Sequence, residues 1–263
     1  MRARNPDTEE LVMTNTSPRT IGVIGAGVMG SGIAQTTATA GFDTVCFDIA
    51  KDALLRGQEA VASGRYGVER GVERGKLSRE AADAALSRLT FSDDFERACA
   101  TDLVIECVPE RLDLKIRTFR DLDRRAPEST ILASNTSGFS IAALAAATDR
   151  PGQVIGWHWA SPPVVMPFAE VVRAEPTRDE TVATVCDTAK RCGKNPIVVQ
   201  DTAMAWGFVA NRIYGAMLRE AQRVIDDGVS DAASINQLMV DCFNWPVGPF
   251  AMVRGATEGW KEE

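Results

Sequence analysis

Short apolar runs alternate with longer segments of helical spacing up to about residue 200. Short runs that are almost wholly apolar predict buried strands. We expect strands at residues 21–24, 44–47, 103–108, 131–133, 154–157 and 168–172. We expect a helix that follows residues 25–30 and runs through residue 40, helices at residues 112–125 and 141–148, and two more within 51–89 that are separated near 71–76. Strands that alternate with helices indicate an α/β fold, with a mostly parallel sheet covered on both faces.

The pattern changes at both ends of this α/β region. The first residues are polar and include Pro6, Asn15 and Pro18, which is typical of a disordered leader. After about residue 201 the apolar runs stop, and residues 207–227 and 232–242 have the spacing of amphipathic helices. We therefore predict a disordered leader at 1–18, an α/β domain at 19–200 and a helical domain at 201–263.

A glycine-rich stretch, GAGVMG, follows the first predicted strand and opens the first predicted helix. Gly25 allows a tight turn, Gly27 lets the backbone approach a pyrophosphate, and Gly30 lets the helix pack close to the strand. Asp48 ends the next strand, where a carboxylate accepts the ribose hydroxyls and repels a 2′-phosphate. The arrangement predicts an NAD site rather than an NADP site. The alternative interpretation of Asp48 is a solvent-facing residue at a strand end.

Composition narrows the class of protein. The net charge of −7 argues against a nucleic-acid partner or an anionic membrane, since both attract basic faces. No apolar run is long enough to cross a bilayer, and the N-terminal residues lack the apolar stretch of a signal peptide. The six cysteines are scattered without the spacing of a metal site. We expect no metal and a reducing, cytoplasmic setting.

Seven motifs, in order and spacing, resemble the 3-hydroxyacyl-CoA dehydrogenase family. They are GAGVMGSGIA (25–34), DLVIECVPE (102–110), ILASNTSGFSI (131–141), IGWHWASPP (155–163), FAEVV (168–172), GFVANR (207–212) and WPVGPF (245–250). The resemblance implies a Rossmann-type, doubly wound parallel sheet, followed by an all-helical domain that usually forms a homodimer interface. It also implies NAD as the cofactor and an acyl thioester as the small-molecule substrate.

The resemblance also assigns residues to the site. The family's active-site positions match Ser137, His158, Glu170 and Asn211. The cofactor side is expected to comprise Gly25, Gly27, Met29, Gly30, Asp48, Glu110, Lys115 and Asn135. The resemblance thus places the reacting groups on both predicted domains.

The chemistry agrees with these assignments. Oxidation of a secondary alcohol needs a hydride acceptor and a base for the hydroxyl proton, and imidazole titrates near physiological pH. A carboxylate such as Glu170 would fix the tautomer of His158 and stabilise its protonated form. Ser137 would bond the substrate oxygen, and Asn211 would contact the thioester side or help to position Ser137.

Each residue also has a structural interpretation. A histidine flanked by two tryptophans is often a core residue, and Glu170 alone fits a surface ion pair. Ser137 fits a turn or a helix cap, and Asn211 a helix start. Glu110 and Lys115 fit an ordinary pair on a helix face.

The chain departs from the family in three places. Ser161 stands where the family usually has Asn, and the segment 201–208 is longer and carries an extra Trp206. The helical domain also ends soon after residue 250, so we expect it to be abbreviated, with an altered dimer interface. A CoA-binding surface would want basic residues near the cleft, and the helical insertion offers Arg56, Arg65, Arg70, Arg74 and Lys76, which also fit a solvated helix face.

These observations predict an NAD-dependent oxidoreductase that interconverts a 3-hydroxyacyl thioester, of CoA or of acyl-carrier protein, and its 3-oxoacyl form. His158 is expected to be the general base and acid, oriented by Glu170. One alternative is a dehydrogenase of a free short hydroxy acid, similar to gulonate or carnitine dehydrogenases. The other is a non-catalytic NAD-binding protein. We expect a homodimer with no nucleic-acid or membrane partner.

Overall fold

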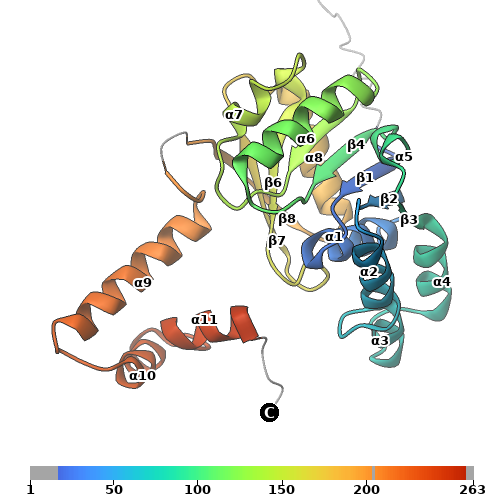
Figure 1. The fold of residues 1–263 in the computed structure, drawn as a ribbon. Helices are drawn as coiled ribbons and strands as arrows, with labels where there is room; N and C mark the ends of the chain where they lie inside the picture. The colour runs from blue at the N-terminus through green and yellow to red at the C-terminus, as the bar shows by residue number, and fades with distance from the viewer. Residues whose placement is uncertain (1–16, 203–204, 259–263) are drawn as a thin grey trace, which may run out of the picture.

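A computed structural model describes residues 17–202 and 205–258 (Figure 1). Its centre is one eight-stranded sheet with the order β3-β2-β1-β4-β5-β6-β7-β8. The strands are β1 (Thr20–Ile24), β2 (Asp43–Phe47), β3 (Leu89–Ser92), β4 (Leu103–Glu106), β5 (Ile131–Ser134), β6 (Val154–Trp159), β7 (Phe168–Arg173) and β8 (Asn195–Gln200). All neighbours are parallel except β6 and β7, which are antiparallel. The prediction of a doubly wound, mostly parallel sheet is confirmed.

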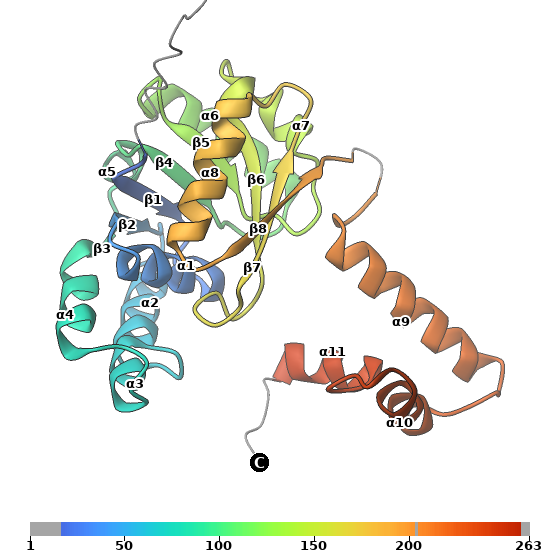
Figure 2. The same cartoon turned by 180° about the vertical axis from the view of Figure 1, so that it is seen from behind.

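Helices cover both faces of the sheet, as Figures 1 and 2 show from opposite sides. They are α1 (Val28–Thr39), α2 (Lys51–Ser63), α3 (Val68–Glu73), α4 (Arg79–Arg88), α5 (Phe95–Cys99), α6 (Leu112–Arg125), α7 (Ile141–Ala145) and α8 (Asp179–Arg191). One buried core joins the sheet to α1 and α8 through side chains such as Ile33 and Val185. The second core joins it to α5, α6 and α7 through side chains such as Phe119 and Leu144. Burial on both faces explains why the central strands are almost wholly apolar.

The structure corrects the sequence-based elements at the sheet edges. Strands β3 and β8 were not predicted, and neither were α5 and α8. Both strands are edge strands: no side chain of β3 is fully buried, and Ile197 in β8 is 64% exposed. The β3 sequence, LTFS, lacks the continuous apolar run that marks a buried strand, whereas β8 contains the run Ile197–Val199 and was missed although that signal was present. The segment 51–89 holds three helices rather than two, because Gly64 and Gly67 end the first helix before α3 begins.

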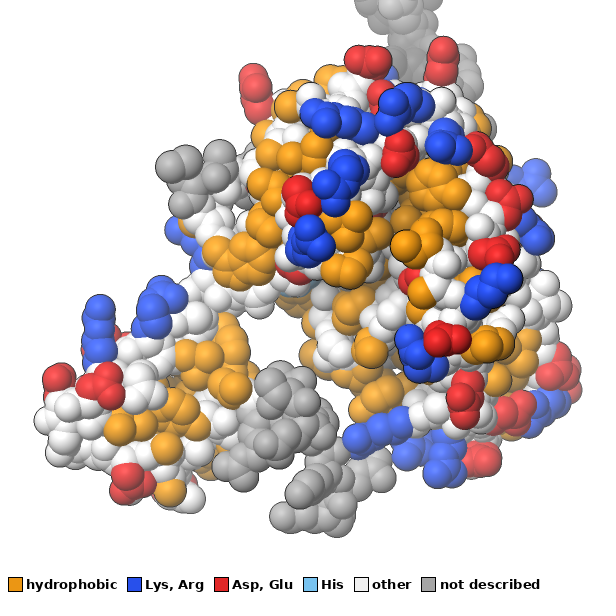
Figure 3. Space-filling model, viewed as in Figure 1, with side chains coloured by type: hydrophobic (Ala, Val, Ile, Leu, Met, Phe, Trp, Pro, Cys, Tyr) orange, Lys and Arg blue, Asp and Glu red, His pale blue; other side chains and the backbone are white. Residues whose placement is uncertain are grey.

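Three helices follow the sheet: α9 (Ala210–Asp226), α10 (Ala232–Phe243) and α11 (Pro249–Glu258). They stand beside the sheet domain and are joined to it through the segment after β8 (Figures 1 and 2). Hydrophobic side chains gather over these helices in Figure 3. Ile213, Leu238 and Phe243 are 67%, 60% and 59% exposed. The predicted all-helical region after the sheet is therefore present, and much of its apolar surface lies open.

Two properties of the described residues bear on function. None of the helices at 17–202 and 205–258 is long and apolar enough to cross a membrane. Within the same ranges, no group of three or more His, Cys, Asp or Glu side chains is placed to hold a metal ion.

Candidate active site

The glycine loop joins β1 to α1 at the carboxyl end of the sheet. Gly25 has a φ of +109°, and a Cβ there would lie 2.7 Å from the carbonyl oxygen of Cys107. A Cβ on Gly30 would lie 1.7 Å from the carbonyl oxygen of Gly25. A Cβ on Gly27, by contrast, would meet nothing within 4 Å. Packing therefore requires glycine at positions 25 and 30, whereas Gly27 leaves space on the side where a ligand would approach.

The start of α1 is suited to a phosphate. No side chain caps this helix at Gly27, and its first turn carries no acidic residue. The first N–H groups of a helix have no partners within the helix, and the helix dipole favours an anion there. The loop and the helix start thus fit the pyrophosphate of a dinucleotide.

Asp48 follows β2 and faces this loop. Its Oδ2 accepts the N–H of Ala26 at 2.8 Å, and its Oδ1 accepts the N–H of Ala50 at 2.9 Å. Lys51 lies 3.9 Å from Asp93, on the exposed side of α2. Beside Asp48, Ile49 is 86% exposed, and Val28 at the start of α1 is 79% exposed. These two exposed apolar side chains offer packing surface to a flat ligand ring, and the sequence pattern had not singled them out.

His158 and Glu170 face each other across the one antiparallel pair of strands. They are direct partners in the β6–β7 register. The Nδ1 atom of His158 and Oε2 of Glu170 are 2.8 Å apart, and both side chains are buried. Within the part of the chain that the structure describes, the other ring nitrogen, Nε2, has no hydrogen-bond partner. The rings of Phe168 and Phe208 lie 5.4 and 6.1 Å from the imidazole, centre to centre. The pair therefore has one ring nitrogen fixed and one left for a substrate.

Glu170 also links the sheet to the C-terminal helices. Its Oε1 accepts the backbone N–H groups of Val209 and Ala210, at 3.0 and 2.9 Å, where α9 begins. Burial raises the pKa of Glu170, but the hydrogen bonds from His158 and from the two amides outweigh burial and lower it overall. The carboxylate is therefore ionised at neutral pH, and it orients the histidine and caps the helix together.

Ser137 and Asn211 meet at the same junction. Nδ2 of Asn211 donates to the carbonyl oxygen of Ser137 at 3.3 Å. Phe139 and Trp206 pack edge to face with their ring centres 5.1 Å apart. Within the described residues, the Ser137 hydroxyl has no hydrogen-bond partner. The segment just before α9, residues 205–209, which we call the linker, therefore packs against the Ser137 loop and leaves the hydroxyl available.

A charged cluster, buried at Glu106 and Lys115 and open to solvent at Glu110, supports the Ser137 loop. Glu110 Oε1 accepts the N–H of Ser137 at 2.9 Å and the hydroxyl of Thr136. Its Oε2 lies 3.0 Å from Lys115 Nζ, which also lies 2.8 Å from Glu106 Oε1. Burial disfavours the Lys115 ammonium, but the two carboxylates raise the pKa of Lys115 overall.

The cluster changes the expected role of Lys115. Lys115 is only 1% exposed, so its ammonium group contacts Glu106 and Glu110 instead of lying at the surface of the cleft. Glu106 was missed in the sequence, although an acid inside the run LVIEC with no exposed face was a visible signal.

Two further expected cofactor residues also have structural partners. Asn135 Oδ1 accepts the N–H of Trp159 at 2.9 Å and so ties the end of β5 to β6. Met29 is partly buried and packs on the core under α1. The loop geometry thus brings Gly25, Gly27, Gly30 and Asp48 together, while Met29 and Asn135 also hold the surrounding structure.

One cavity borders the β6–β7 loop (residues 160–167), and another borders Asn211. One, of about 460 Å³, lies between α3 and the β6–β7 loop, and we call it the basic cavity. It is lined by Arg65, Arg70, Arg74, Lys76, Val164 and Val165, among others. Arg56, the fifth basic residue singled out in the sequence, does not line it.

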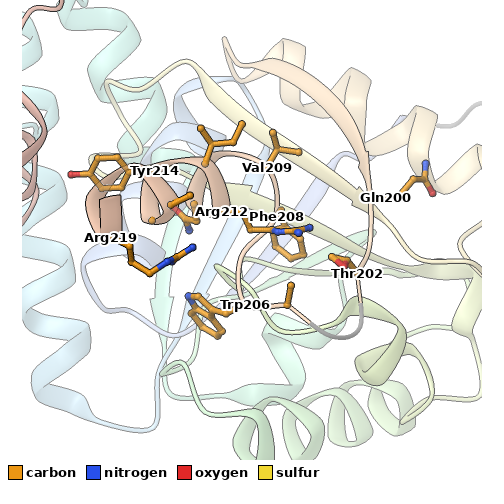
Figure 4. A pocket seen from close by; sticks show the side chains of 13 residues that line it. Gln200, Thr202, Trp206, Phe208, Val209, Arg212, Tyr214 and Arg219 are labelled. Atoms are coloured by element: carbon orange, nitrogen blue, oxygen red, sulfur yellow. The ribbon is translucent and has the colours of Figure 1, made fainter. Parts of the chain in front are cut away.

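The other cavity, of about 930 Å³, lies where the linker meets α9. Trp206, Phe208 and Arg212 face it in Figure 4, and Asn211 also lines it. The candidate centre therefore opens on one side toward the C-terminal helices.

Comparison with known proteins identifies the family. The NAD-binding domain of 3-hydroxyacyl-CoA dehydrogenase matches residues 20–202, and the C-terminal domain of the same family matches residues 207–261. The chain belongs to the 3-hydroxyacyl-CoA dehydrogenase family. It is therefore an NAD-dependent oxidoreductase, and the predictions of the family and of the cofactor are confirmed.

Individual relatives agree. The chain is 39% identical over 231 residues to a probable 3-hydroxybutyryl-CoA dehydrogenase of Deinococcus radiodurans, covering 88% of this chain and 81% of the relative. It is 34% identical over 231 residues to a 5-formyl-3-hydroxy-2-methylpyridine 4-carboxylate 5-dehydrogenase of Mesorhizobium japonicum. This match covers 88% of this chain and 71% of the relative. The crystal structure of (S)-3-hydroxybutyryl-CoA dehydrogenase from Ralstonia eutropha superposes with a TM-score of 0.85 at 39% identity. The superposition covers 90% of this chain and 81% of that structure.

Proposed function

We propose that this protein interconverts a 3-hydroxyacyl-CoA and the corresponding 3-oxoacyl-CoA, with His158 as the general base and acid. The observation that carries the proposal is the His158–Glu170 pair, 2.8 Å apart and buried, with Nε2 left without a partner in the described chain. A base held in one tautomer beside a dinucleotide loop is the arrangement that alcohol oxidation requires.

His158 removes the proton of the substrate hydroxyl through Nε2 in the oxidative direction and returns it in the reductive direction. Glu170 keeps the Nδ1 proton in place and stabilises the imidazolium that forms. Because Glu170 is ionised, its negative charge is present throughout the pH range in which an imidazole titrates. Its two amide partners at the start of α9 prevent it from rotating away.

Ser137 and Asn211 bind and orient the substrate. The Ser137 hydroxyl is free to donate to the substrate oxygen, and its loop is fixed by Glu110 through the N–H of Ser137. Asn211 braces the same loop from α9 through the Ser137 carbonyl. A hydroxyl group held from both sides loses little conformational freedom when the substrate arrives.

The dinucleotide site fits NAD. The loop around Gly27 and the start of α1 would hold the pyrophosphate, and the Asp48 carboxylate would accept the ribose hydroxyls. When bound, NAD supplies the hydride acceptor for the alcohol carbon. Glu110, Lys115 and Asn135 then shape the cofactor side of the cleft by holding the loops that follow β4 and β5.

The carrier is proposed to be CoA rather than an acyl-carrier protein or no carrier. The basic cavity lies beside the β6–β7 loop, which continues directly from the strand that bears His158. Its arginine and lysine side chains suit the phosphates of CoA. A free hydroxy acid would make no use of them.

We also propose a homodimer formed through the C-terminal helices. Ile213, Leu238 and Phe243 leave an apolar surface on α9 and α10 that a second copy would bury. Light scattering tests the mass in solution, and a monomer at micromolar concentration would refute the dimer.

The function is tested by following NADH oxidation with acetoacetyl-CoA. The wild-type protein is expected to turn over, and His158→Ala to lower kcat by roughly 10²–10⁴-fold while NADH affinity stays unchanged. Acetoacetate serves as the free-acid arm, since one relative is named for a free carboxylate substrate. Near-normal turnover by His158→Ala would show that His158 is not the general base. Turnover of acetoacetate without turnover of acetoacetyl-CoA would show that the substrate is not a CoA thioester.

A further inference from the structure

Lys194 is a buried cation outside the site described above. The helix α8 ends at Arg191, and Gly193 turns the chain with a φ of +70° so that the next side chain points inward. Lys194 is only 5% exposed. Its Nζ donates to the carbonyl oxygens of Met166, at 2.8 Å, and of Pro163, and lies 5.1 Å from the centre of the Trp159 ring.

The partners of Lys194 are unusual for a buried ammonium. No carboxylate within residues 17–202 and 205–258 forms an ion pair with it, and burial lowers its pKa. Burying an unpaired charge costs free energy, so the two carbonyl bonds and the indole face offset that cost. The indole contact lies at Trp159, the last residue of β6, and the two carbonyl contacts lie in the β6–β7 loop that follows it, residues 160–167.

The β6–β7 loop connects the two parts of the candidate centre. It begins next to the strand of His158 and ends at the strand of Glu170. On its inner side Pro163 packs on α1 at Gly32. A Cβ at Gly32 would lie only 3.1 Å from the Pro163 ring. On its outer side Val164 and Val165 line the basic cavity. Val165 and Met166 are 52% and 37% exposed, so the outer side is an apolar strip.

We propose that Lys194 is a positioning residue for thioester binding. It holds the β6–β7 loop so that its apolar strip forms the wall between His158 and the basic cavity, against which the pantetheine arm of CoA lies. This inference rests on the proposed function, because it assumes a CoA thioester in that path. Two carbonyl anchors spaced three residues apart fix the loop against both rotation and translation.

The test compares Lys194→Met with Lys190→Met, an exposed lysine on α8 paired with Asp187. With acetoacetyl-CoA, Lys194→Met is expected to raise KM about 10-fold and to change kcat less than 3-fold. The KM for NADH stays unchanged. With the N-acetylcysteamine thioester of acetoacetate, which lacks the phosphates and most of the arm, the KM changes less than 3-fold. Lys190→Met behaves as the wild type.

A second variant approaches the same loop from the other side. Gly32→Ala pushes on Pro163 without touching Lys194, and it is expected to raise the KM for the CoA thioester in the same way. If Lys194→Met does not fold, as judged by NADH binding, Gly32→Ala decides the question. Calorimetry of free CoA binding gives a measurement without turnover.

Each outcome is decisive. Wild-type turnover with an unchanged KM in the folded variants overturns the role of Lys194 and leaves the proposed function standing. Equal losses with both thioesters indicate a merely structural residue and also overturn it. A wild-type protein that neither binds CoA nor turns over its thioesters refutes the proposed function, and the wall with it.

Discussion

At the scale of single residues, Asp48 determines what the dinucleotide site accepts. Its two oxygens each hold one backbone amide, and each keeps a lone pair for a ribose hydroxyl. Asp48→Ala is expected to weaken NADH binding roughly 10–100-fold, the value of a hydrogen bond to a charged group, and to narrow the gap to NADPH. Fluorescence titration with both cofactors measures this. Asp52→Ala, in the exposed first turn of α2, is the control, and an unchanged ratio of the two affinities would remove Asp48 from the ribose.

The negative charge of Glu170 is expected to matter more to catalysis than the shape of its side chain. Glu170→Gln keeps the shape of the side chain but replaces a carboxylate that serves His158 and two amides together. We expect kcat to fall by about 10²-fold or more, because the imidazolium loses its counter-charge, while the KM for NADH stays the same.

Steady-state kinetics at saturating NADH checks this expectation for Glu170. The matched control is Glu175→Gln, an exposed residue just after β7. A kcat within threefold of the wild type would mean that the carboxylate is only a helix cap.

At the scale of elements, Asp102 fastens the start of β1 to the start of β4. Its Oδ2 accepts the N–H groups of Arg19 and Thr20, at 2.8 and 2.9 Å, and the Thr20 hydroxyl at 2.9 Å. Burial raises the pKa of Asp102, but these three donors outweigh it, so the pKa of the folded state lies below the usual 3.8. The unfolded chain therefore takes up the proton first as the pH falls.

Asp102 therefore stabilises the folded protein at neutral pH and less so in acid. The stabilisation by Asp102 is complete above pH 3.8 and is lost as the pH falls through the lowered value. Asp102→Ala is expected to lower the free energy of unfolding by about 1 kcal/mol at pH 7, a small value because the residue is exposed. The difference from the wild type should shrink at about pH 3.

Urea unfolding at both pH values measures this difference, with the exposed Asp227→Ala as the control. A difference that grows in acid would show that the three hydrogen bonds do not favour the ionised form.

At the scale of the whole molecule, the centre is built where the linker crosses the sheet domain. Gly138 touches that linker: a Cβ there would lie 2.3 Å from the backbone nitrogen of Gly207 and 2.8 Å from the Trp206 ring. Gly138→Ala must therefore move the linker or the Ser137 loop. We expect kcat/KM for the thioester to fall at least 10-fold, since small misplacements are costly in catalysis, with NADH affinity retained.

Kinetics and NADH titration of Gly138→Ala check this. The control is Gly215→Ala within α9, whose nearest neighbour is the flexible end of Arg219 at 3.3 Å. Retained kcat/KM in Gly138→Ala would show that the junction between linker and loop does not govern the chemistry.

Features that depend on neighbouring residues along the chain were predictable without the structure. The glycine loop was readable because the turn at Gly25 and the close contact at Gly30 are local demands on the backbone. The helix at residues 112–125 was predicted with the bounds that α6 has. The central strands were recognised because burial on both faces makes them continuously apolar. The family motifs supplied the names of the site residues.

How distant segments of the chain meet could be seen only in the folded protein. The strands β3 and β8 lie at the sheet edges: β3 has no continuous apolar run, and β8 has one whose Ile197 and Val198 are exposed, so the sequence alone does not place either strand in the sheet. Lys115 was expected on the cofactor side of the cleft, with an exposed helix-face pair as the alternative, but it is buried against Glu106, 9 positions away along the chain. The antiparallel register of β6 and β7 places Glu170 opposite His158, and the linker brings the start of α9 to Glu170. Neither contact can be predicted from the spacing of apolar and polar residues within one segment. The spacing of a motif can identify a candidate residue, but its contacts depend on how the sheet and helices pack.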